Sequence, residues 1–86
     1  MHVSIQDYKF VPSLLTVSVG TTVTWTNDGV DNHTTTSTSN PRVWDSGDMP
    51  GGLTPPSSFS FTFTTPGTYA YVCSYHSIMK GTITVQ

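Results

Sequence analysis

Several residue types are scarce in this 86-residue chain. Cys73 is the only cysteine, so no disulfide can form within the chain. There are three Lys or Arg residues, five aspartates and no glutamate, which gives a formal net charge of −2. A chain with so few basic residues lacks the positive face that nucleic acid binding requires, and no apolar run approaches membrane-spanning length. Nucleic acid partners and a membrane span are therefore not expected.

The length of the chain predicts one domain covering residues 1–86, because there is no room for a second core. A chain of this size buries only about two-thirds of its unfolded surface. With no disulfide available, a bound metal is one way to add stability to the folded state. Met1 and His2 lead directly into strand-like sequence, so we expect no export signal at this end of the chain.

What the chain has instead is alternation of apolar and polar residues, the period of half-buried strands. Turn signals rich in Gly, Asn, Asp and Pro separate the alternating runs, and no window shows sustained helical periodicity. The pattern predicts an all-β fold, an antiparallel β-sandwich of about seven to eight short strands. The alternating residues are Val3 and Ile5; Leu15, Val17 and Val19; Val23 and Trp25; Phe59, Phe61 and Phe63; Tyr69, Tyr71 and Cys73; Ile83 and Val85.

One segment, residues 39–56, interrupts this rhythm with SNPRVWDSGDMPGGLTPP. So long a connection in a small domain is usually functional or mobile. We expect it to cross from one sheet to the other and to anchor in the core through Trp44. The aspartates, in this segment and elsewhere, are expected to form turns or to be solvated, since no two of them are arranged for acid–base chemistry.

The stretch CSYHSIM, residues 73–79, contains three potential metal donors at three-residue spacing: Cys73, His76 and Met79. Cys73 should point inward at the end of a strand. We expect a loop carrying His76 and Met79 to close over one point, and Gly81 to permit a sharp return into the last strand. His33 follows a turn signal at residues 27–29 and should lie at the same end of the sandwich. Two imidazoles, one thiolate and a weaker thioether suit copper in both oxidation states.

Taken singly, each donor has a structural explanation. A lone cysteine at a strand end is more often a small buried apolar residue than a ligand. The joint spacing of Cys73, His76 and Met79, with His33 upstream, favours copper over these explanations, although zinc suits thiolate and imidazole equally well. His2 lies outside the pattern, and we expect it to be exposed and to have no part in the site.

These motifs resemble the cupredoxins, the small blue copper proteins. The resemblance rests on C-x-x-H-x-x-M after Tyr-x-Tyr-x, on the following Lys-Gly, and on a histidine after Val-x-Trp-x-Asn. It extends over nearly the whole chain, including VSVGTTVTWTND, WDSG and TTPGTYAYVC. Within the family, the seven-residue ligand segment is most similar to that of the amicyanins, and the chain as a whole to amicyanin and plastocyanin.

The resemblance implies a Greek-key β-sandwich with one type 1 copper per chain. It makes His33, Cys73 and His76 the equatorial ligands and Met79 the long axial ligand. It also implies one-electron transfer, with copper cycling between Cu(II) and Cu(I), rather than enzymatic activity. Proteins of the family usually work outside the cytoplasm, so a periplasmic or other extracytoplasmic location is expected for a monomeric carrier between redox proteins.

The chain departs from the family pattern at two places around the ligands. Tyr75 and Ser77 flank His76, where amicyanin-like segments commonly have prolines. Thr34 and Ser74 stand where many relatives join the two ligand segments through an asparagine, and we expect these two hydroxyls to pair instead. Both differences should affect the reduction potential, because hydrogen bonds behind the ligands and loop rigidity tune the metal.

Redox partners are expected to dock on an apolar rim around His76, which would be the site of electron exit. With so few charges, partner encounters should depend little on salt. A copper delivery or storage domain with the same ligands remains an alternative that the sequence does not separate. A multicopper enzyme would need further histidines, and only His2 is left. The residues expected to form the rim are Val30, Met49, Pro50, Leu53 and Ile78.

Overall fold

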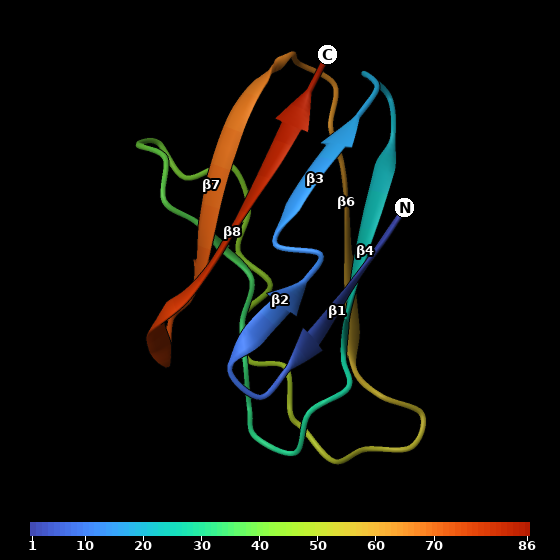
Figure 1. Cartoon of the computed structure of the whole chain (residues 1–86), viewed down its shortest axis with the longest axis vertical. Coiled ribbons are helices and arrows are strands. Elements are labelled where there is room, and N and C mark those ends of the chain that lie inside the picture. Colours follow the sequence, from blue (N-terminus) through green and yellow to red (C-terminus); the bar gives the residue numbers. More distant parts are fainter.

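The computed structural model describes residues 1–86 and contains eight strands and no helix (Figure 1). It therefore contains no helix long and apolar enough to cross a membrane. The predicted sandwich of about seven to eight strands is confirmed. The strands are β1 (His2–Gln6), β2 (Lys9–Val11), β3 (Leu14–Val17), β4 (Thr22–Asn27), β5 (Thr36–Ser37), β6 (Ser58–Thr62), β7 (Gly67–Cys73) and β8 (His76–Val85).

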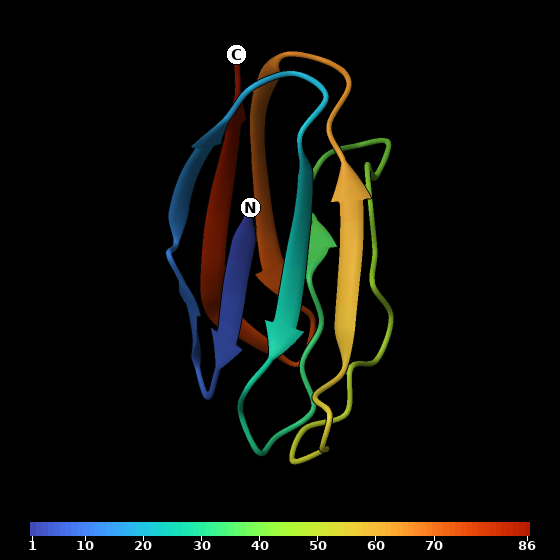
Figure 2. The same ribbon diagram turned by 90° about the vertical axis from the view of Figure 1, so that its right-hand side faces the viewer.

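The strands form two four-stranded sheets, in the orders β2-β1-β4-β6 and β3-β8-β7-β5. Pairing is not antiparallel throughout, as the alternation alone suggested: β1 pairs with β4, and β3 with β8, in parallel. The reason is the connectivity. After β2 the chain crosses to the other sheet as β3 and returns as β4, which therefore enters the first sheet beside β1 and in the same direction (Figure 2).

The core between the sheets takes its residues from the predicted alternation. Along β4, Val23 and Trp25 are fully buried while their neighbours are half-buried or exposed. The same pattern holds at Val3 and Ile5 in β1 and toward the ends of β7 and β8. Val19, by contrast, is exposed, because β3 ends at Val17 and the chain turns there. His2 is exposed, as expected.

The irregular segment 39–56 carries the chain from β5 in one sheet to β6 in the other, which confirms the predicted crossing. Trp44 anchors it, also as predicted: the side chain is buried, and its ring centroid lies 5.3 Å from Phe63 and 5.5 Å from Trp25. Its Nε1 donates a hydrogen bond to Thr35 Oγ1 at 3.0 Å. A long loop is thus held by one aromatic residue, with its indole nitrogen satisfied.

Gly81 does not have the role that the sequence suggested. It lies inside β8, which runs from His76 to Val85 without a sharp return, and its φ is not positive. A Cβ at this position would lie 2.2 Å from Cζ of Tyr71 and 2.4 Å from its hydroxyl oxygen. Glycine is required here because the ring of Tyr71, on the neighbouring strand β7, covers the backbone.

Candidate metal centre

The segment CSYHSIM is a tight hairpin rather than a loop. Cys73 is the last residue of β7 and His76 the first residue of β8, and the two are paired across the strands. Only Ser74 and Tyr75 form the turn between them. The hairpin register therefore brings the thiol and the imidazole together directly. Met79 lies further along β8 and is buried in the core, at 1% exposure.

His33 reaches the same place from the connection between β4 and β5. Its backbone forms a two-way bridge with Met49, with N–O distances of 3.1 and 2.8 Å. Asn27, at the end of β4, donates from Nδ2 to the carbonyl oxygens of Asp31 and Met49. These bonds hold the connection closed over the end of the sandwich, and the His33 side chain is completely buried.

The three donors converge. His33 Nδ1 lies 3.6 Å from Cys73 Sγ, and His76 Nδ1 lies 3.7 Å from the same sulfur. One donor atom from each of the three residues lies within 4.8 Å of the others. Cys73 and His33 are fully buried, whereas His76 is half-buried and is the one residue of the three that reaches solvent. The structure thus joins residues that are 40 positions apart in the sequence.

Two hydroxyls link the segments that carry these donors, as the sequence predicted. The backbone nitrogen of Ser74 donates to Thr34 Oγ1 at 2.8 Å, and Thr34 Oγ1 donates to Ser74 Oγ at 3.2 Å. Thr34 follows His33, and Ser74 follows Cys73. A pair of small hydroxyl residues therefore connects the two ligand segments.

Asp7 is a residue of the site that the sequence analysis missed. It lies in the turn between β1 and β2, and its Oδ1 is 2.8 Å from His33 Nε2. Hydrogen bonds from the backbone nitrogen of Val30 and from the His33 ring hold the pKa of Asp7 below its usual value. Asp7 was expected to form a turn or to be solvated. It is 26 positions from His33, and no local pattern marks that contact.

The donor set fits copper. A carboxylate can only accept, so His33 Nε2 must carry the hydrogen, and Nδ1 then presents its lone pair toward Cys73. One thiol and two imidazole nitrogens facing one another in a buried place are ligands suited to copper or zinc. A thioether is a soft donor that favours copper, and the buried Met79 carries one three residues after His76 on β8.

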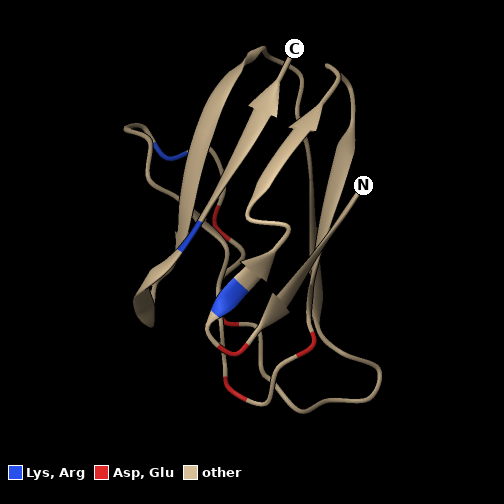
Figure 3. Ribbon diagram, viewed as in Figure 1, with Lys and Arg blue, Asp and Glu red and all other residues tan.

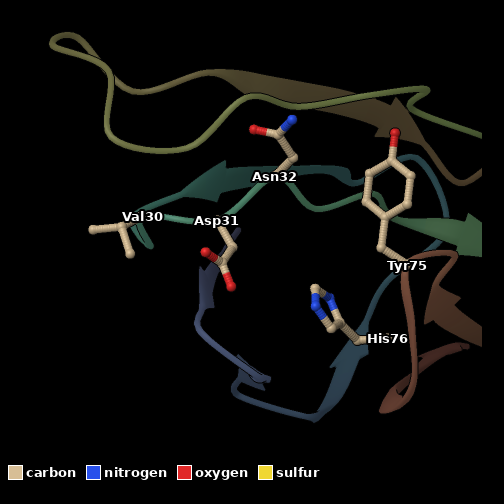
Figure 4. Close-up of a pocket in the computed structure, with 5 residues that line it drawn as sticks. All are labelled: Val30, Asp31, Asn32, Tyr75 and His76. Carbon is tan, nitrogen blue, oxygen red and sulfur yellow. The ribbon is translucent and has the colours of Figure 1, made fainter.

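Of the five residues expected to form an apolar rim, four are exposed and one is not. Val30, Leu53 and Ile78 are exposed, at 76%, 51% and 83%. Met49 does not belong to the rim: its side chain is buried at 3% exposure, because its backbone pairs with His33 and turns the thioether inward. An open pocket lies beside His76, and in Figure 4 the side chains of Asp31 and His76 both project into it. Val30, Asn32 and Tyr75 complete its lining.

Most acidic residues of the molecule gather at one end. Figure 3 shows most of the aspartates around the loops at the lower end, where β1 and β4 end. Most of them are held by hydrogen bonds: Asp28 accepts from Ser4 Oγ, and Asp31 from the Tyr8 hydroxyl, both at 2.6 Å. The few basic residues lie apart from one another. The surface is therefore weakly acidic at the end that carries the three donors.

Comparison with known proteins gives the family. Residues 1–86 match the family described as copper binding proteins, plastocyanin/azurin family. The chain is 37% identical to a plastocyanin from Scenedesmus fuscus over 91 residues, covering 90% of this chain and 86% of that protein. It is 34% identical to amicyanin-alpha from Methylorubrum extorquens over 85 residues, covering 99% of this chain and 71% of that protein.

Solved structures agree. A purple cupredoxin from Nitrosopumilus maritimus superposes with a TM-score of 0.87 at 29% identity, covering 99% of this chain and 98% of that one. A reduced Cu(I) form of an amicyanin mutant gives a TM-score of 0.88 at 30% identity, covering 100% of this chain and 81% of that one. With its convergent thiol and imidazoles, the chain belongs to the plastocyanin/azurin family of copper-binding proteins, the cupredoxins, and is similar to amicyanin and plastocyanin.

Proposed function

We propose that His33, Cys73, His76 and Met79 are the ligands of a single type 1 copper ion. The observation that carries this assignment is the approach of both Nδ1 atoms to Cys73 Sγ, at 3.6 and 3.7 Å, in a buried place. Met79 is proposed as the weaker fourth ligand from its place in C-x-x-H-x-x-M, three residues after His76 on β8, and from its burial at 1% exposure.

The protein is a one-electron carrier. When bound to this donor set, copper supplies the Cu(II)/Cu(I) couple, because sulfur suits the reduced ion and imidazole suits the oxidised one. The chain contributes by holding its donors in place. Cys73 is fixed by the hairpin register, and His33 by Met49 and Asp7. Their burial keeps water away from the thiolate. A site held this way resists rearrangement when its charge changes, as fast electron transfer requires.

His76 is proposed as the point of electron exit, since it is the one half-buried ligand. Partners would dock on the surrounding apolar residues Val30, Pro50, Leu53 and Ile78, all exposed. We further propose that residues 1–86 act as one monomeric domain without enzymatic activity, in the periplasm or another extracytoplasmic space. The small net charge of −2 supports docking that depends mainly on apolar contact.

The test is the visible spectrum of the reduced, metal-free protein as Cu(II) is added. An intense charge-transfer band that saturates at one copper per chain is expected, because a thiolate–copper bond absorbs strongly. Cys73→Ser should bind copper without this band, and His76→Ala should weaken binding and alter the band. His2→Ala is the matched control, since His2 is exposed and lies outside the site.

A band that survives in Cys73→Ser, or that fails to form in the unmodified chain, would contradict the proposed ligands. Electron self-exchange measured on the copper-loaded protein then separates a carrier from a delivery or storage domain. A carrier should exchange electrons rapidly with little dependence on ionic strength, whereas a storage site need not exchange them at all.

A further inference from the structure

We propose that the turn at residues 7 and 8, between β1 and β2, is a positioning element for both histidine ligands. Asp7 would fix the ring of His33, and Tyr8 would limit the movement of the half-buried His76. This inference rests on the proposed copper ligands. It concerns a segment that lies far from C-x-x-H-x-x-M in the sequence and contributes no ligand itself.

The carboxylate of Asp7 is held on both of its oxygens. Oδ2 accepts from the backbone nitrogen of Val30 at 3.0 Å, and Oδ1 accepts from that of Asp31 at 3.2 Å and from His33 Nε2 at 2.8 Å. The two backbone bonds orient the carboxylate, and the carboxylate then orients the ring. A metal-bound histidine whose other nitrogen donates to an oriented carboxylate has a fixed tautomer and is a stronger electron donor.

The chain leaves space for this carboxylate at Gly29. A Cβ on residue 29 would lie 2.3 Å from Asp7 Oδ1 and 2.9 Å from Cγ, so any larger side chain displaces the carboxylate. The φ of Gly29 is not positive, so the glycine is needed here for space rather than for conformation. Gly29→Ala therefore offers a way to move the Asp7 carboxylate without changing Asp7 itself.

Tyr8 contacts the other imidazole. Its ring centroid lies 5.0 Å from that of His76 at an interplanar angle of 68°, an edge-to-face contact. Its hydroxyl donates to Asp31 Oδ2 at 2.6 Å. The φ of Tyr8 is +102°, a conformation that is strained for any residue but glycine. Since the side chain is 55% exposed, burial does not impose this conformation; the contacts with His76 and Asp31 help to maintain it.

The charge of Asp7 should act on the copper couple. A negative group bonded to a ligand stabilises the more positive oxidised ion, so its loss should favour Cu(I) and raise the reduction potential. Asp7→Asn is expected to change the ratio of Cu(II) to Cu(I) affinity by about tenfold, which equals a rise of about 59 mV for one electron. Gly29→Ala should raise the potential in the same direction, because it moves the carboxylate away.

Asp28→Asn is the matched control, since Asp28 carries the same charge in the adjacent loop but bonds Ser4 rather than His33. If Asp7→Asn and Gly29→Ala shift the potential no more than Asp28→Asn does, the positioning role of Asp7 is refuted. Unfolding of each metal-free variant is measured alongside, so that a general loss of stability is not taken for an effect on the site.

A measurement on the metal-free protein separates this proposal from the proposed function. The Nε2 proton of His33 should give a slowly exchanging NMR signal that disappears in Asp7→Ala and Gly29→Ala. Its absence from the unmodified chain would refute the Asp7 contact even if the blue band forms. Its presence without the blue band would retain the contact and reject the copper assignment instead.

The contribution of Tyr8 is tested by the rate at which Cu(I) passes to an added chelator. Tyr8→Leu should release copper about tenfold faster, because the aromatic contact with His76 is lost. Tyr8→Phe keeps that contact and loses only the hydroxyl bond to Asp31, so it should stay close to the unmodified rate. Equal rates in Tyr8→Leu and the unmodified protein would refute this half of the proposal.

Discussion

At the scale of single residues, Thr34 joins the two ligand segments through a hydrogen bond. It is buried, it follows His33, and its hydroxyl accepts from the backbone of Ser74 at 2.8 Å. Ser74 in turn follows Cys73. Because the bond joins backbone to side chain across the two segments, it limits how far the thiol and the imidazole can separate when the metal is absent.

Thr34→Val tests this role with nearly unchanged volume. The variant leaves the nitrogen of Ser74 without its partner, and we expect the metal-free protein to lose about 1–3 kcal/mol of unfolding free energy. The reduction potential should also shift, because the connection between the ligand segments is weakened. Urea denaturation and voltammetry give the two values. Thr38→Val is the comparison, since Thr38 is exposed and its hydroxyl donates to the carbonyl oxygen of Ala70 rather than linking the two ligand segments. Equal stabilities of the two variants would show that the Thr34 bond has no special weight.

At the scale of secondary structure elements, the β7–β8 hairpin performs two tasks. Its turn pairs Cys73 with His76, and its body forms the centre of one sheet. The second task requires Tyr71 of β7 to lie over Gly81 of β8, which are register partners. The ring packs inward beside Trp25, with centroids 5.5 Å apart. The pairing of β7 with β8 therefore sets both the packing of Tyr71 against Gly81 and the approach of Cys73 to His76.

Gly81→Ala is expected to destabilise the protein by about 1–3 kcal/mol, because the new methyl group collides with the Tyr71 ring. The cost should largely vanish in a Tyr71→Val background, where the colliding ring atoms are absent. A double-mutant cycle measured by chemical denaturation gives the coupling energy. If the cost of Gly81→Ala is the same in both backgrounds, its origin lies in the backbone rather than in the contact with Tyr71.

At the scale of the whole molecule, stability should depend on alkaline pH through Tyr71. The residue is completely buried, and neither its hydroxyl nor Trp25 Nε1 has a hydrogen-bond partner. Burial raises the pKa of Tyr71 from 10.0 to about 12. The folded state therefore keeps its proton where the unfolded chain has already lost it. The stability is fully present below pH 10 and declines as the pH rises toward 12.

The expected decline is about 2–3 kcal/mol of unfolding free energy between these two pH values. Hydrogen bonds to Asp31 and Asp48 also raise the pKa of Tyr8 and Tyr75, so other tyrosines contribute to alkaline unfolding. Tyr71→Phe isolates the buried one. Denaturation of both metal-free proteins at pH 9 and pH 11.5 should show a smaller decline in Tyr71→Phe. Equal declines would mean that Tyr71 ionises in the folded state as readily as in the unfolded chain.

The sequence by itself determined the strands, the sandwich and the types of donor. Alternation of apolar residues and the spacing in C-x-x-H-x-x-M are local properties, and side chains of a strand follow them directly. The pairing of Thr34 with Ser74 and the anchoring of Trp44 were also predicted, because each depends on residues that adjoin recognisable motifs.

Only the tertiary structure decided the parallel pairings, the burial of Met49, the reason for Gly81 and the contact of Asp7 with His33. Each of these depends on which distant segments meet after the sheets have packed. An aspartate in a turn has the same local sequence whether its carboxylate faces water or a buried ring. A glycine likewise does not reveal whether it is needed for a turn of the backbone or for close contact with a neighbouring side chain. Such differences arise from the space left between elements, which periodicity does not describe.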